Sequence, residues 1–141
     1  MTTKNLKPIT VQTTVNANIE KVWDYWTMQE HITNWNFASD EWCCPRALND
    51  VKPGGKFSWR MEAKDGSMGF DFEGEYIDIV EKKLITYRIA DGRSVIVKFT
   101  ENGNQVTVSE TFEAEGINSD ELQRAGWQAI LDNFKNYVET N

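Results

Sequence analysis

The feature that most constrains this chain is a run of alternating apolar and polar residues, broken by glycine turns, between residues 57 and 110. Alternation with a period of two is typical of β-strands that bury one face. The dipeptides Asp65-Gly66, Asp91-Gly92 and Asn102-Gly103 are typical of the tight turns of hairpins. The run therefore predicts an antiparallel meander, in which each strand pairs with the one before it.

The turns also predict which residues face each other. Counting outward from the first turn places Met61 opposite Phe70. It also places Trp59 opposite Phe72, so that one face of this hairpin is apolar. The apolar phase then changes before Ile79, which predicts a β-bulge between residues 74 and 77 that curves the sheet.

The later turns require a choice of loop length. At Asp91-Gly92 a two-residue loop would bring Tyr87 opposite Ile96 and mix the faces, so a bulged three-residue loop that includes Arg93 is predicted. Asn102-Gly103 is predicted to form a type I′ turn. Across the first of these turns the predicted pairs are Tyr87 with Val97 and Ile85 with Phe99. Across the second they are Phe99 with Val106, Val97 with Val108 and Val95 with Glu110.

Helical patterns flank the meander. A strand over residues 9–15 is followed by polar residues suited to capping a helix, then by apolar residues with helical spacing at positions 19, 22, 23 and 26. Residues 29–35 predict a second short helical piece, and an irregular stretch is expected around Cys43-Cys44-Pro45. Ser119 is expected to cap a long helix that runs to about Val138. The order predicts a single α+β domain over residues 1–141, in which a curved antiparallel sheet wraps around a long C-terminal helix.

Composition excludes several classes of function. The 15 Lys and Arg residues against 22 Asp and Glu give a formal charge of −7, with no basic run to follow a phosphate backbone, so nucleic acid is not an expected partner. The apolar stretches are too short for a membrane span and the N-terminus lacks a signal-peptide pattern, so no membrane partner is expected and the cytoplasm is the expected compartment. Cys43 and Cys44 are expected to be reduced thiols, and neither a metal nor a cofactor is predicted.

Several of these segments resemble a known family. The residues that carry the resemblance are the segment from Ala17 to Trp23, Trp35, the turn Val51-Lys52-Pro53-Gly54-Gly55-Lys56-Phe57, the segment from Gly74 to Ile79, and Gly126-Trp127. In this order they are similar to homologues of the activator of the heat-shock-protein-90 ATPase, within the START-like or polyketide-cyclase-like (SRPBCC) superfamily. The resemblance implies a helix-grip fold with an internal cavity. A fold of this kind does not by itself determine function.

The aromatic residues of the predicted inner face are candidates for lining that cavity. A stripe of this kind usually fills a core, and the resemblance to a cavity-bearing family is what favours a ligand site. Glu110 falls on the same face, where it could orient a ligand hydroxyl or amine, or reach solvent at a strand end. The candidate ligand-binding residues are Trp59, Met61, Phe70, Phe72, Tyr87, Phe99, Glu110, Trp127 and Leu131.

Three functions remain open at this stage. The first is binding of a small, largely hydrophobic molecule, and the second is an enzyme of cyclase or hydrolase type that uses Glu110 or Tyr87 to move protons. No catalytic motif is present and His31, the only histidine, has no partner suggested by the sequence, so no catalytic residue is predicted. The third is contact with a chaperone, which is disfavoured because the chain lacks the length for the additional N-terminal domain of eukaryotic activators.

Overall fold

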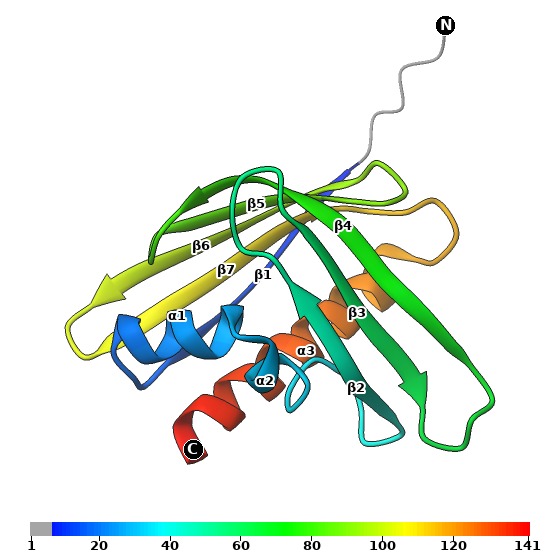
Figure 1. Cartoon of the computed structure of the whole chain (residues 1–141), viewed down its shortest axis with the longest axis horizontal. Helices are drawn as coiled ribbons and strands as arrows, with labels where there is room; N and C mark the ends of the chain where they lie inside the picture. The colour runs from blue at the N-terminus through cyan, green and yellow to red at the C-terminus, as the bar shows by residue number, and fades with distance from the viewer. Residues whose placement is uncertain (1–6) are drawn as a thin grey trace, which may run out of the picture.

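The fold was obtained as a computed structural model, which describes residues 7–141. It contains seven strands and three helices in these residues (Figure 1). In chain order they are β1 (Pro8–Val15), α1 (Ile19–Thr27), α2 (Gln29–Ile32), β2 (Trp42–Asn49), β3 (Lys56–Ala63), β4 (Gly69–Val80), β5 (Leu84–Ile89), β6 (Ser94–Asn102), β7 (Gln105–Glu113) and α3 (Asp120–Thr140).

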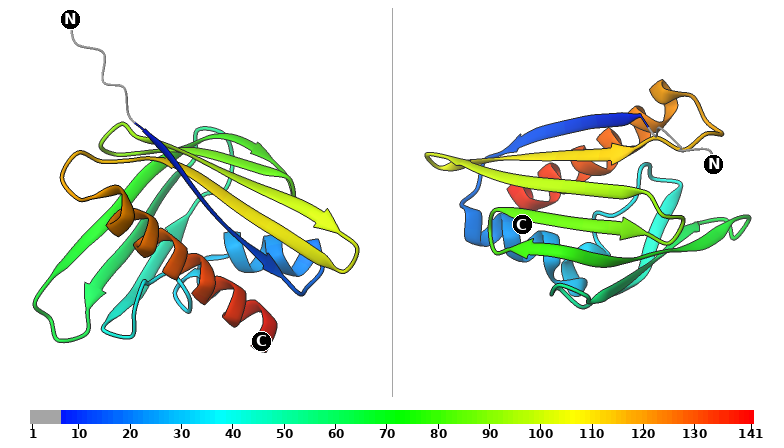
Figure 2. Two further views of the ribbon diagram at one scale, coloured as in Figure 1. Left: turned by 180° about the vertical axis from the view of Figure 1, so that it is seen from behind. Right: turned by 90° about the horizontal axis from the view of Figure 1, so that it is seen from above.

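The strands form one antiparallel sheet in the order β1-β7-β6-β5-β4-β3-β2. The sheet curves around α3, which crosses its concave side, while α1 and α2 close one end (Figure 2). This arrangement confirms the predicted α+β helix-grip fold. The physical reason is that the apolar faces of the sheet and of α3 can leave water only by covering each other.

Both main helices begin where the sequence predicts. The Asn18 side chain accepts a hydrogen bond of 2.9 Å from the backbone N–H of Lys21 at the start of α1. The Ser119 hydroxyl accepts one of 3.1 Å from Leu122 at the start of α3. These caps satisfy amide groups that have no partner inside the helix. All four predicted apolar residues of α1 are buried, which confirms the helical stripe.

The register of the first hairpin and the bulge are also confirmed. Met61 faces Phe70 and Trp59 faces Phe72 between β3 and β4. The register of β4 with β5 shifts by one residue between Tyr76 and Asp78, where the bulge was predicted. The extra residue bends β4 and increases the curvature of the sheet.

The two later hairpins keep the predicted faces, but the predicted pairs are wrong by two positions. Tyr87 pairs with Val95, because the three-residue loop spans residues 90–92 and the amide of Ile89 bonds to the carbonyl of Arg93. The turn between β6 and β7 also lies one residue later than predicted, with Gly103 as its first central residue at φ +64°. Glycine in that position is typical of a type II′ turn. The observed pairs are Ile85 with Val97 across the first turn, and Val95 with Phe112, Val97 with Glu110 and Phe99 with Val108 across the second.

The stretch around Cys43-Cys44-Pro45 is an edge strand, β2, and not an irregular segment. Its register with β3 shifts between Cys43 and Arg46, at the position of the proline. Proline cannot donate a ladder hydrogen bond, so it is tolerated at an edge or a bulge, and here it occupies both. The strand was not predicted because Pro45 is a strong sequence signal against strand structure.

Helix α3 lies closer to one side of the sheet than to the other. Arg124, Gln128 and Lys135 donate hydrogen bonds of 2.9, 3.1 and 2.7 Å to carbonyls of the edge strand β1. These bonds cover an otherwise free sheet edge and hold α3 over β1. Strands β3 and β4 lie on the far side of the curved sheet from β1 (Figure 2), so their inner face is less closely covered by the helix.

Candidate functional site

A cavity of about 260 Å³ lies between α3 and the inner face of β3, β4 and β5. Its walls are mainly aromatic and aliphatic, which is typical of sites for small organic ligands. The lining residues are Trp26, Trp35, Asn36, Ala38, Trp59, Met61, Phe70, Phe72, Tyr87, Arg93, Glu110, Gly126, Trp127 and Ile130.

Seven of the nine residues proposed from the sequence line this cavity. The other two, Phe99 and Leu131, are buried elsewhere in the core. Phe99 packs with its ring edge-on to Trp23 and Trp26, at centroid distances of 5.3 and 5.8 Å. Phe99 faces inward as predicted, but α1 covers that part of the sheet, which the local pattern does not reveal. Leu131 of α3 is fully buried.

The structure adds lining residues that the sequence did not suggest for the site. Trp26 and Trp35 come from α1 and from the segment after α2, and Asn36 and Ala38 follow directly. Trp26 was recognised only as part of an apolar helical stripe. No local pattern marked Asn36 or Ala38, because these residues reach the cavity through the path of a connecting segment.

Aromatic rings form the wall on both sides of the cavity. Trp127 of α3 stacks on Phe112 of β7, with centroids 4.1 Å apart and planes inclined by 8°. The ring of Trp59 is parallel to that of Phe72, with centroids 5.5 Å apart. Phe72 and Trp127 meet edge to face across 6.3 Å and so link the sheet to the helix. Trp127 is only partly buried, because the cavity leaves part of its ring uncovered.

Glu110 is the buried carboxyl group of the site. It belongs to β7, pairs across the sheet with Val11 and Val97, and is only 5% exposed. Burial raises the pKa of this carboxyl to about 8, because the charged form loses its hydration. Its side chain has no hydrogen bond to any residue among 7–141. Glu110 lines the cavity, so its carboxyl group is available to a molecule bound there.

Two further polar side chains face the cavity. Tyr87 is buried and burial raises its pKa well above the usual value, with the nearby Glu110 charge adding to the effect. Asn36 is also buried, and its amide has no side-chain hydrogen bond within the described part of the chain. Together with Glu110 they provide acceptors and donors in an otherwise apolar space.

Trp59 contributes a ring to the wall and an unpartnered donor to the interior. Its indole Nε1 is buried and bonds to no acceptor among the described residues. Leaving such a group unpaired costs about 1–3 kcal/mol. The wall is therefore not optimised for stability alone at this position.

Gly126 lies on the cavity side of α3 in the middle of the helix. A Cβ atom at this position would meet nothing within 4 Å. The sequence left open whether this glycine brings the helix close to the sheet or leaves space. The geometry supports the interpretation that the glycine leaves space, because no neighbouring atom is close enough to clash with a larger side chain at its Cβ position.

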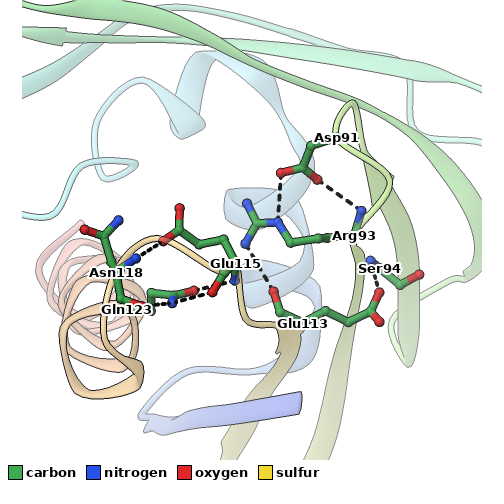
Figure 3. Close-up of polar contacts among 7 residues, drawn as sticks. All are labelled: Asp91, Arg93, Ser94, Glu113, Glu115, Asn118 and Gln123. Carbon is green, nitrogen blue, oxygen red and sulfur yellow. Dashed lines mark hydrogen bonds and ion pairs between the residues drawn. The ribbon is translucent and has the colours of Figure 1, made fainter. Parts of the chain in front are cut away.

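A polar network fixes one end of the cavity (Figure 3). Arg93 donates to Asp91 at 2.8 Å and to the carbonyl of Glu113 at 3.1 Å, which ties the β5–β6 turn to the end of β7. Gln123 of α3 donates to the carbonyls of Glu115 and Asn118 at 3.1 and 2.8 Å, and its own carbonyl accepts from the amide of Glu115 at 2.8 Å. The start of α3 is thereby tied to the segment that connects it to β7.

The remaining chemical groups noted in the sequence lie outside the cavity. His31 bonds through Nδ1 to the hydroxyl of Tyr137 at 2.8 Å and stacks on Tyr25. Cys44 is buried, and burial raises the pKa of its thiol to about 11. Within residues 7–141 no three His, Cys, Asp or Glu side chains gather in a way that could hold a metal ion, and no helix is long and apolar enough to cross a membrane.

A second hollow, of about 590 Å³, opens on the outer face of β3, β4 and β5. Its rim carries exposed charged residues, among them Lys56, Glu73 and Glu75. Water reaches these groups freely, so they offer little to a ligand beyond screened surface contacts. The smaller inner cavity is the better candidate site because its polar groups are desolvated.

The curved sheet, the gripping helix and the partly open apolar cavity define a helix-grip protein of the type that typically serves as a ligand-binding scaffold. Residues 16–139 match the family described as activator of Hsp90 ATPase homolog 1-like protein. The chain belongs to this family. The resemblance seen in the turn and helix motifs is thus confirmed.

Solved structures agree with this assignment. The AHSA1-like protein from Aeromonas hydrophila is 40% identical, with a TM-score of 0.89 over 95% of this chain and 93% of that one. A protein from Cytophaga hutchinsonii is 52% identical, with a TM-score of 0.82 over 94% and 92% of the two chains. A protein from Chromobacterium violaceum shares the fold, with a TM-score of 0.83 over 95% and 98% of the chains at 20% identity. No curated protein matches the chain.

Proposed function

We propose that this protein binds a small, largely apolar molecule in the cavity between α3 and β3, β4 and β5. The observation that carries the proposal is the combination of an aromatic wall with a buried, unpartnered carboxyl group at Glu110. A protein selected for stability alone would gain by filling this space and by replacing the carboxyl. The cytoplasm, expected from the sequence, is the proposed compartment.

The volume limits the size of the ligand. Pockets for drug-sized molecules span roughly 300–1,000 Å³, and this cavity of about 260 Å³ lies just below that range. A ligand with one or two rings is therefore favoured over a long chain. Phe70 is 48% exposed and borders the cavity, which marks a route of entry beside the β3–β4 hairpin.

Gly126 allows the proposal to be tested without disturbing the walls. Gly126→Leu would extend a side chain into the cavity, and the free space around the missing Cβ means that the helix itself is not strained. Gly116→Leu is the matched control, because a Cβ at Gly116 also meets nothing within 4 Å and this residue does not line the cavity.

The measurement is binding of naphthylmethanol, followed through the indole N–H resonances of the protein, together with native mass spectrometry of freshly purified protein for a retained guest. The wild type and Gly116→Leu are expected to bind the probe, whereas Gly126→Leu is expected to lose binding. Equal binding by all three proteins would place the probe outside the cavity. A wild type that neither retains a guest nor binds the probe would refute the proposal.

An enzyme of cyclase or hydrolase type is the second candidate. It is favoured by Glu110, because a carboxyl with a pKa of about 8 is mostly protonated at neutral pH and can give a proton and take it back. Tyr87 would share the same space. Turnover of a bound guest that Glu110→Gln abolishes, while binding persists, would favour this function over simple binding.

A further inference from the structure

The chemical groups of the cavity also restrict the class of ligand, and this inference rests on the ligand-binding function proposed above. We infer that the ligand is an apolar molecule that carries one protonated amine, and that the ammonium group lies against the carboxylate of Glu110. Four observations support a cation over a neutral or anionic polar group.

The first observation is that an acidic partner is already in place, which becomes a carboxylate when it gives up its proton. Glu110 is 5% exposed, faces the cavity and has no hydrogen bond or ion pair with any residue in the described part of the chain. The desolvation of this carboxyl has therefore already occurred during folding. An incoming ammonium loses its own hydration and displaces the carboxyl proton, but the carboxyl needs no further dehydration, which makes the site preorganised for a positive charge.

The second observation concerns the only arginine of the cavity lining, Arg93. Its Nε and Nη1 atoms are engaged by Asp91 and by the carbonyl of Glu113, at the turn end of the cavity. Its charge is compensated there by the carboxylate of Asp91. Glu110 therefore has no internal counter-ion, and a ligand cation can supply one.

The third observation is the chemistry of the walls. Trp59, Phe72, Tyr87 and Trp127 border the same space as Glu110. Aromatic faces attract cations through their negative quadrupole, by about 0.5–1 kcal/mol at exposed sites and by about 2 kcal/mol when the cation is desolvated. The same rings provide the apolar contact area for the body of the ligand.

The fourth observation is the charge of the whole chain. A formal charge of −7 produces a field that attracts cations and repels anions. An anionic ligand would approach against this field and would disfavour the ionised form of Glu110. A neutral hydroxyl could bond to Glu110, but it would gain nothing from the field and little from the aromatic faces.

The test compares three probes of nearly equal shape, naphthylmethylamine, naphthylmethanol and naphthoate, by calorimetry or by titration of the tryptophan indole resonances. The wild type is expected to bind the amine at least about tenfold more tightly than the alcohol, and the naphthoate least tightly. Glu110→Gln keeps the size of the side chain and removes its charge. It is expected to abolish the preference for the amine while the alcohol still binds.

Glu101→Gln is the control, because Glu101 is exposed on β6, and its replacement changes the net charge equally without touching the cavity. It is expected to leave the preference for the amine almost unchanged. If the wild type binds alcohol as tightly as amine, or if the preference survives in Glu110→Gln, the cation inference is wrong and the ligand-binding function stands. If none of the three probes binds, the proposed function itself fails and the inference fails with it.

Discussion

The two halves of the space under α3 differ in how completely they are filled. Around Phe134 the helix is tightly covered, with the rings of Trp26 and Trp35 both at 4.8 Å. About two turns earlier, at Gly126 and Trp127, the same helix faces the cavity. One continuous apolar stripe thus serves as packed core at one end and as a cavity wall at the other. Trp26 and Trp35 pack on Phe134 and also border the cavity, so they lie at the boundary between the two regions.

The largest expected effect comes from the packed half. Phe134→Ala removes a fully buried ring and should lower the free energy of unfolding by about 3–5 kcal/mol. Urea denaturation at neutral pH measures the change. Phe70→Ala, at the exposed mouth of the cavity, is the control and should cost far less. Similar losses for the two variants would contradict the division into packed and open halves.

The next largest effect is the pH dependence of stability that the buried Glu110 of the open half should cause. The ordinary pKa of a glutamate is 4.5, whereas burial raises that of Glu110 to about 8 in the folded protein. Between these values the folded state holds a proton that the unfolded state has released, so stability falls as pH rises, by up to about 1.4 kcal/mol per pH unit. The loss of stability should begin above pH 4.5, the pKa of the glutamate in the unfolded chain, and level off above pH 8, its pKa in the folded protein.

Glu110→Gln removes this titration. The variant is expected to match the wild type near pH 5 and to exceed its free energy of unfolding at pH 9 by roughly 2–4 kcal/mol. Denaturation at both pH values provides the measurement, with Glu101→Gln as the exposed control. A wild type whose stability does not fall over this range would show that Glu110 has a counter-ion or reaches water.

A smaller effect is expected for Trp127, on the wall of the open half. Its ring stacks on Phe112 but borders the cavity, so Trp127→Ala should cost about 1–3 kcal/mol, below the roughly 3–5 kcal/mol of a packed aromatic residue. Affinity for naphthylmethanol should fall at the same time. A full core-sized loss of stability with unchanged binding would make Trp127 a structural residue only.

The smallest effect tests whether the space beside α3 is open. Gly126→Ala adds a methyl group that meets no atom within 4 Å, so the gain in helix propensity should raise the free energy of unfolding by roughly 0.5–1 kcal/mol. Thermal or urea denaturation can resolve this gain. A loss of stability would show that the helix lies closer to the sheet than the structure indicates.

Local patterns in the sequence were enough to predict most of the fold. The alternation of β3 and β4 predicted the pairing of Trp59 with Phe72, and the change of phase predicted the bulge after Tyr76. The two later turns were each predicted one residue away from their observed positions. Several loop positions keep the same side chains on the inner face, so the pattern does not distinguish between them. Strand β2 was missed because its pairing depends on a neighbouring strand and its own sequence contains Pro45.

For the site, periodicity alone was enough to predict which side chains face inward, since the period of a strand or helix sets the face on which a residue lies. It selected Glu110 and Trp127 in this way, and both line the cavity. The packing of the helices on the sheet was needed to show that Phe99 and Leu131 are covered while Gly126 faces open space. The reason is that a cavity forms where no helix packs on the inner face of the sheet. The positions of α1, α2 and α3 over the sheet determine where this happens, and no local pattern shows it.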